Sequence, residues 1–187
     1  MPNIAEQLAE LRNTVDASQS LVIPLGKIIP IFVECLVSGK KVLACGNGGS
    51  ASDAMHLVEE LVGRYRTNRR ALPAISLSTD PTVLTCIAND WGYDEVFKRQ
   101  VEAHGQPGDF FVCFSTSGNS PSILAALETA RKAKLRTLAM LGKNGGKAKG
   151  MAEFELIVPS DNTARIQEIH TWILHVLLEA IEEELGL

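Results

Sequence analysis

The sequence lacks the features that mark nucleic-acid-binding, secreted or membrane-spanning proteins. Its 18 Lys and Arg are outnumbered by 22 Asp and Glu, a balance that disfavours electrostatic capture of nucleic acid or an anionic membrane. The amino-terminal segment MPNIAEQLAELRN carries acidic residues and no apolar core of the signal-peptide kind. The longest strongly apolar run, residues 28–37, is shorter than a bilayer span and contains Pro30 and Glu34. We therefore expect a cytoplasmic protein whose partners are small molecules or proteins, with no nucleic acid and no membrane.

Cysteine is scarce, and its spacing forms no CxxC motif. The chain also lacks internal repeats, low-complexity segments and linkers, so residues 1–187 are expected to form a single domain. The cysteines stand singly in apolar stretches, which predicts buried free thiols in a reducing compartment. They are Cys35, Cys45, Cys86 and Cys113.

Buried strands and amphipathic helices are predicted to alternate along the chain. Apolar residues at helical spacing predict two helices within residues 3–38, with a break near 18–24. After the first strand, a helix is expected with Ser50 or Ser52 as its cap. This alternation predicts a doubly wound α/β fold, in which ligands bind beyond the carboxyl ends of the strands. The expected strands of its parallel sheet are residues 41–46, 74–78, 110–115, 136–141 and 154–159.

A glycine-rich loop follows the first predicted strand. Gly46, Gly48 and Ala51 match the dinucleotide pattern GxGxxA, but the acidic residue expected about twenty positions later is missing. That region reads GRYRTNRRALP, so no nucleotide cofactor is expected. The glycines still let backbone N–H groups approach an anion at a helix N-terminus, and a tight turn without a ligand remains the alternative.

A second loop, STSGNS at residues 115–120, lies between a predicted strand and a predicted helix. Its hydroxyl groups, the flexible Gly118 and the free amides of a helix start form a nest suited to one phosphate group. No lysine follows as in a Walker loop, which favours a sugar phosphate over a nucleoside triphosphate. Serines acting only as helix caps are the alternative.

Two helices carry histidine together with other polar groups. His56 and Glu60 are four residues apart and share a helix face, from which Glu59 is expected to turn aside. Such a pair binds metal, acts as acid and base, or is a surface interaction. The final helix places His170 and His175 among apolar residues, and we expect one of the two to be functional.

Four segments in matching order resemble the phosphoheptose isomerases of the sugar isomerase (SIS) superfamily. They are CGNGGSASDAMHLVEELVGRY, IANDWGYDEVF, STSGNS and ARIQEIHTWILH. The resemblance implies a three-layer α/β sandwich with a five-stranded parallel sheet and two extra amino-terminal helices within 1–38, packed on the domain and at an oligomer interface. It also implies a homotetramer with active sites between subunits. The implied reaction interconverts D-sedoheptulose 7-phosphate and D-glycero-D-manno-heptose 7-phosphate, an early step towards activated heptose for lipopolysaccharide core or surface glycans.

The same resemblance implies roles for individual residues. Glu60 and His175 are the expected catalytic residues, and one zinc ion per subunit is expected on His56, Glu60, Gln167 and His175. Zinc would weaken Glu60 as a base, and Gln167 lies eight residues from His175, roughly 12 Å along a straight helix. The expected substrate-binding residues are Asn47, Gly48, Gly49, Glu60, Asn89, Asp90, Ser115, Thr116, Ser117, Ser120 and Gln167.

Two alternatives remain at this level. A related SIS protein that is not an enzyme binds the replication initiator DnaA, but such members lack the equivalents of His56, Glu60 and the final-helix histidine. An isomerase of another sugar phosphate is also compatible, because the loops do not measure carbon number. Arg64, Arg66, Arg69 and Arg70 either reach a neighbouring subunit's substrate or form a solvated loop.

Overall fold

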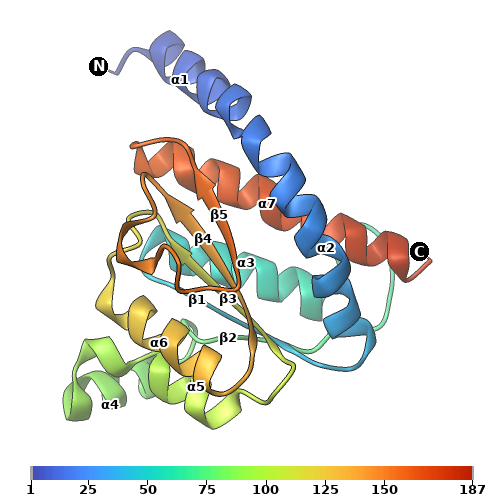
Figure 1. The fold of residues 1–187 in the computed structure, drawn as a ribbon, viewed down its shortest axis with the longest axis vertical. Coiled ribbons are helices and arrows are strands. Elements are labelled where there is room, and N and C mark those ends of the chain that lie inside the picture. Colours follow the sequence, from blue (N-terminus) through green and yellow to red (C-terminus); the bar gives the residue numbers. More distant parts are fainter. Residues whose placement is uncertain (1, 187) are drawn as a thin grey trace.

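The computed structural model describes residues 2–186, which form a parallel sheet between two layers of helices (Figure 1). The sheet order is β2-β1-β3-β4-β5, and every pairing is parallel, as the sequence predicted. The doubly wound three-layer α/β fold is thereby confirmed. The strands are β1 Val42–Gly46, β2 Ala74–Ser76, β3 Phe110–Ser115, β4 Arg136–Gly142 and β5 Phe154–Val158.

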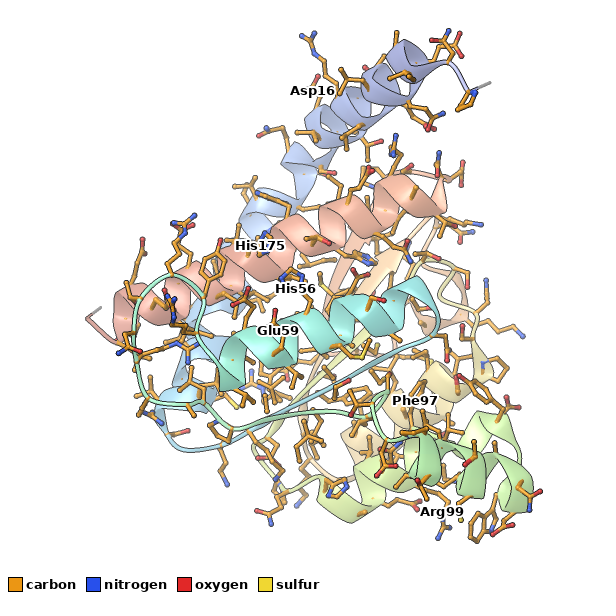
Figure 2. All side chains as sticks on the ribbon, turned by 180° about the vertical axis from the view of Figure 1, so that it is seen from behind. Asp16, His56, Glu59, Phe97, Arg99 and His175 are labelled. Carbon is orange, nitrogen blue, oxygen red and sulfur yellow. The ribbon has the colours of Figure 1, made fainter. Side chains whose placement is uncertain are left out.

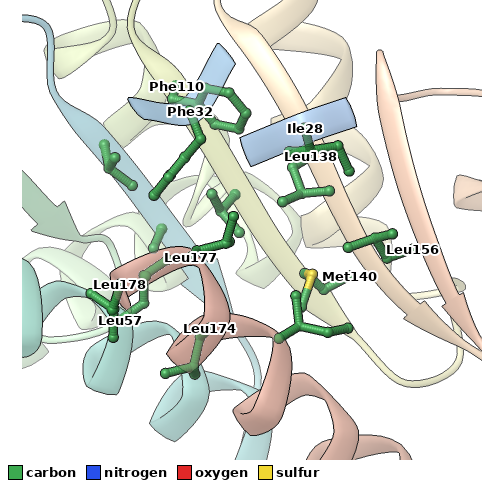
Figure 3. Packing of buried hydrophobic residues seen from close by; sticks show 14 of the residues in the cluster. Ile28, Phe32, Leu57, Phe110, Leu138, Met140, Leu156, Leu174, Leu177 and Leu178 are labelled. Carbon is green, nitrogen blue, oxygen red and sulfur yellow. The ribbon is translucent and has the colours of Figure 1, made fainter. Parts of the chain in front are cut away.

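Each face of the sheet has its own hydrophobic core, because successive side chains of a strand point to opposite faces. On one face, Phe110 and Leu138 pack under α2, α3 and α7 (Figure 3). On the other, Phe111 and Ala139 pack under α4, α5 and α6. The helices are α2 Val22–Val37, α3 Gly49–Val62, α4 Pro81–Trp91, α5 Lys98–His104, α6 Pro121–Lys132 and α7 Thr163–Glu184.

The amino-terminal helices form one long rod whose first half stands away from the sandwich (Figure 1). The predicted break is a short 3-10 segment, η1 Ser18–Leu21, between α1 Ile4–Ala17 and α2. Together they make a 34-residue helical stretch that is long and apolar enough, by those criteria alone, to cross a membrane. This stretch is much longer than the apolar run at residues 28–37, from which a bilayer span was not expected. Core helices meet the same criteria, and α2 buries Phe32 and Leu36 completely.

The start of α3 differs from the sequence-based expectation. The helix begins at Gly49, with Gly48 at the cap position and no side-chain cap, so neither Ser50 nor Ser52 caps it. Gly48 has φ +57, a backbone conformation that favours glycine and starts the helix before the serines. The amides of Ser50 and Ala51 in the first turn donate to the backbone carbonyls of Asn47 and Gly48, so they need no side-chain cap.

Candidate active site

Helices α3 and α7 run side by side in the same direction and bring together residues far apart in the sequence (Figure 2). Gln167 lies at the start of this α3–α7 seam, so close to Gly49 that a Cβ there would be 2.3 Å from its Nε2. One turn further, Asp53 Oδ1 is 3.5 Å from the Thr171 hydroxyl. Along the seam, each of these positions on α3 therefore faces a polar side chain at the corresponding position on α7.

A cluster of two histidines and two carboxylates occupies the far half of the seam. His56 Nε2 is 3.6 Å from Glu60 Oε1, and the His56 and His175 rings meet edge to face with centroids 5.1 Å apart. Glu59 belongs to the cluster as well, since its ligand atom and those of His56 and Glu60 lie within 4.8 Å of one another. The expectation that Glu59 turns aside is therefore wrong, because residues three apart are also helix neighbours.

The donor types of this cluster suit a zinc ion. Imidazole nitrogens and carboxylate oxygens are common zinc ligands, and three protein ligands suffice for a catalytic site. His56, Glu59 and Glu60 have ligand atoms within 4.8 Å of one another, and the His175 ring lies beside that of His56. Gln167 is not part of this group within one chain, because it lies against Gly49 at the other end of the seam.

Burial adjusts the acid–base properties of two groups in the seam. Desolvation lowers the pKa of His175. The electrostatic effect of His56 lowers it further, whereas the carboxylate of Glu60 raises it. A neutral imidazole is the form that accepts a proton or binds a metal. Desolvation also raises the pKa of Asp53 to about 6, and its Oδ2 is buried without a hydrogen-bond partner among residues 2–186.

The STSGNS loop, predicted to be an anion cradle, packs closely against the loop after β4. Ser115 ends β3 and is buried, and α6 starts at Pro121 without a side-chain cap. Gly118 has φ +62, and a Cβ there would lie 1.9 Å from the Gly145 carbonyl oxygen. Asn119 Oδ1 accepts the Lys147 amide at 3.1 Å, which holds the neighbouring loop against the cradle.

Asn47 in the first loop has both ends of its side-chain amide engaged. Tyr93 donates its hydroxyl to Asn47 Oδ1 at 2.7 Å, and Asn47 Nδ2 donates to Ser122 Oγ at 3.1 Å. This ties the glycine loop to the start of α6 and to the segment after α4. No role was predicted for Tyr93 or Ser122, because both contacts join segments that are distant in the sequence.

The last turn of α4 carries Asn89 and Asp90, which were predicted to bind substrate. Asn89 and Asp90 are exposed, and Asn89 Nδ2 donates to Asp90 Oδ1 at 2.8 Å. They lie on the sheet face opposite to α3 and α7 (Figure 1). The structure of one chain therefore does not bring them into the His56–Glu60–His175 cluster.

The two final-helix histidines have different surroundings. His170 is fully buried, donates from Nε2 to the Leu141 carbonyl at 3.1 Å and meets the Phe114 ring edge to face. Its Nδ1 has no hydrogen-bond partner within the described part of the chain. His170 is therefore a core residue, which leaves His175 as the histidine available for chemistry.

Because desolvation lowers the pKa of His170 from 6.5 to about 4, its contribution to stability should depend on pH. The unfolded chain takes up this proton first, so stability is lost as pH falls from 6.5 towards 4, by up to about 3 kcal/mol. Asp53 acts in the opposite direction, since its raised pKa favours proton uptake by the folded state. We expect urea unfolding of His170→Gln to lose less stability over that pH interval than the unsubstituted protein, and equal losses would contradict this.

Comparisons with known proteins agree with this architecture. The SIS domain family model matches residues 5–142. The phosphoheptose isomerase of Fusobacterium nucleatum is 52% identical over 156 residues, covering 83% of this chain and 80% of that protein. The Helicobacter pylori phosphoheptose isomerase is 49% identical, with 95% and 92% covered. The structure of phosphoheptose isomerase GmhA from Neisseria gonorrhoeae superposes with a TM-score of 0.91 at 38% identity, covering 96% and 97%. The chain therefore belongs to the SIS-domain family and, within it, to the phosphoheptose isomerases.

Proposed function

We propose that this protein interconverts D-sedoheptulose 7-phosphate and D-glycero-D-manno-heptose 7-phosphate, and so serves activated-heptose biosynthesis. The observation that carries the proposal is that Glu60 on α3 and His175 on α7 both lie beside His56, in a chain that belongs to the phosphoheptose isomerases. The DnaA-binding alternative is disfavoured because this chain keeps His56, Glu60 and His175.

The reaction needs one base at carbon and one proton carrier at oxygen. Moving the carbonyl from C2 to C1 removes a proton from C1, passes through a cis-enediol and returns a proton to C2. Glu60 is the base for the carbon-bound proton. His175, neutral at pH 7 because burial lowers its pKa, moves the proton between the two oxygens.

Zinc would polarise the carbonyl and enediol oxygens when bound at His56, Glu60 and His175. Gln167 would join them only if the seam shifts, since its side chain lies against Gly49. A carboxylate held tightly by a metal is a weaker base, and Glu59 offers a second carboxylate that relieves Glu60 of this conflict.

The substrate's phosphate would bind in the STSGNS cradle, which belongs to the strand end where α/β folds bind ligands. Ser115, Thr116, Ser117 and Ser120 supply hydroxyl groups, and α6 begins beside them without a competing side-chain cap. The sugar chain would contact Gly48, Gly49 and Gln167, with Asn47 positioned by Tyr93 and Ser122.

We propose a cytoplasmic homotetramer with its active sites between subunits, in which the amino-terminal helices form part of the interface. Apolar side chains of the rod are exposed in the single chain, including Leu8 at 68% and Ile23 at 73%. A groove of about 430 Å³ between the rod and α7 is lined by Leu11, Val15 and Trp172. A neighbouring subunit would also account for Asn89 and Asp90, which are far from the cluster within one chain.

We expect the purified protein to contain about one zinc per chain, measured by inductively coupled plasma mass spectrometry. His56→Ala should lose most of this metal because it removes one imidazole ligand, whereas His104→Ala, on exposed α5, should retain it. A metal-free preparation with full turnover would remove zinc from the mechanism.

The substrate assignment is tested by a coupled assay that compares sedoheptulose 7-phosphate with hexulose and pentulose phosphates. The proposal predicts that kcat/KM is highest for the seven-carbon ketose. Preference for a shorter sugar would keep the isomerase and reject the heptose assignment. Absence of turnover with all of them would favour a binding protein instead.

A further inference from the structure

Tyr65, just beyond α3, stacks on the ring of His175. Their ring centroids are 5.5 Å apart and their planes differ by 22°. On another side, His175 meets the His56 ring edge to face at 5.1 Å and 80°. The orientation of the His175 imidazole is therefore set by two rings, only one of which belongs to the His/Glu cluster.

A buried carboxylate from α7 holds the segment that carries Tyr65. Glu182 is 4% exposed and accepts the backbone N–H groups of Tyr65 at 3.1 Å, Arg66 at 3.0 Å and Thr67 at 3.1 Å. It lies seven residues after His175, two helical turns along the same face of α7. Helix α7 thus supplies both the ring that Tyr65 covers and the acceptor that keeps Tyr65 in place.

Arg69 connects the same carboxylate to the end of α3. Its side chain is 1% exposed, and its Nε lies 3.3 Å from Glu182 Oε1. The guanidinium donates to the backbone carbonyls of Leu61, at 2.9 Å, and of Glu60. Both carbonyls belong to the last turn of α3, and the Leu61 carbonyl also accepts the Leu72 amide at 3.0 Å.

We infer that residues 63–70 are a positioning segment for the isomerase site, with Tyr65 orienting His175 and the Arg69–Glu182 pair fixing the turn that carries Glu60. The inference rests on the proposed function. A buried ion pair adds little net stability compared with apolar packing, whereas it specifies geometry through its fixed donors and acceptors. Here that geometry joins the two helices on either side of the proposed proton transfer.

The first test compares Tyr65→Phe with Tyr65→Leu in the isomerase assay. Phenylalanine keeps the stacked ring, so kcat should stay within ~2-fold of the unsubstituted protein. Leucine keeps bulk without a flat ring, and kcat should fall ~10- to 100-fold, the scale expected when a catalytic group is misplaced by about 1 Å. KM should change less than ~3-fold, because Tyr65 positions His175 rather than substrate. Full kcat in Tyr65→Leu would overturn the inference.

The second test does not depend on activity. The chain has four histidines, so selectively ¹³C-labelled imidazoles give a countable NMR spectrum. Stacking under Tyr65 should shift the His175 ring protons upfield, and Tyr65→Leu should move them downfield while the signals of His104 and buried His170 stay in place. Unchanged His175 signals would overturn the inference even if the protein proves inactive towards sedoheptulose 7-phosphate. Absence of turnover with a normal His175 shift would instead reject the proposed function alone.

The link through Glu182 is tested by non-additivity. Glu182→Gln preserves shape but weakens acceptance from the three amides and Arg69, so kcat should fall and the His175 signals should move as in Tyr65→Leu. If both residues act through one segment, the double variant should be no more than ~2-fold slower than the slower single variant. Losses that multiply would show that Glu182 does not act through Tyr65, and would overturn that link.

Discussion

Glu60→Gln should lower kcat for sedoheptulose 7-phosphate by about 10³-fold, within the range of removing a general base. Glutamine has the size of glutamate and keeps a polar side chain beside His56, but it cannot take a proton from carbon. The pair distance of 3.6 Å between His56 Nε2 and Glu60 Oε1 places this carboxylate inside the cluster rather than on open surface. The coupled isomerase assay under substrate saturation measures the loss.

Two further variants make the Glu60 result specific. Glu102→Gln, on the exposed surface of α5, should leave kcat unchanged. Glu59→Gln separates the two neighbouring carboxylates, because Glu59 shares the cluster but is more exposed. An inactive Glu59→Gln together with an active Glu60→Gln would reverse the assignment of the base.

His175→Asn should lower kcat by about 10²- to 10³-fold, because the variant loses the group that moves the proton between the substrate oxygens. Asparagine retains a polar amide but does not titrate. His175 is suited to the role because desolvation lowers its pKa, which keeps the imidazole neutral and able to accept a proton at pH 7.

A histidine outside the cluster provides the control for His175. His104→Asn, at the exposed end of α5, should retain full kcat and the zinc content of the unsubstituted protein. If zinc and His175 share the site, His175→Asn should also retain less metal. Full turnover of His175→Asn would remove this residue from the mechanism.

The fold was predictable because each strand is a short, continuous apolar run. Successive side chains of FFVCFS and RTLAML point alternately into the two cores. A strand that is buried on both faces needs apolar residues at every position, which is the pattern of a parallel sheet covered by helices. The cap of α3 was not predictable, because serine usually caps a helix and only the positive φ of Gly48 moves the start forward. Glu59 was misjudged for a local reason, since spacing by three was treated as a different face.

Contacts between distant segments explain what the sequence could not reveal about the site. The Arg-rich stretch after α3 was predicted to be either a solvated loop or a substrate contact. In the structure, the Arg69 side chain is buried against Glu182, which lies 113 residues later in the sequence. Tyr93 and Tyr65 lie in segments that resemble the family, but no role was predicted for them, because their contacts with Asn47 and His175 are tertiary. Gln167 and His175 are separated along α7, as their spacing of eight residues predicted: Gln167 contacts Gly49, whereas His175 contacts His56.

The central claim is that Glu60 moves a proton between the first two carbons of a heptose phosphate, and isomerisation in D₂O tests it most directly. The account predicts that D-glycero-D-manno-heptose 7-phosphate made by the unsubstituted protein carries solvent deuterium at C2, detected by NMR. Glu60→Gln should form neither this product nor exchanged starting ketose at a comparable rate. Formation of the aldose by Glu60→Gln at the rate of the unsubstituted protein would contradict the account, because the proton would then reach C2 without the Glu60 carboxylate.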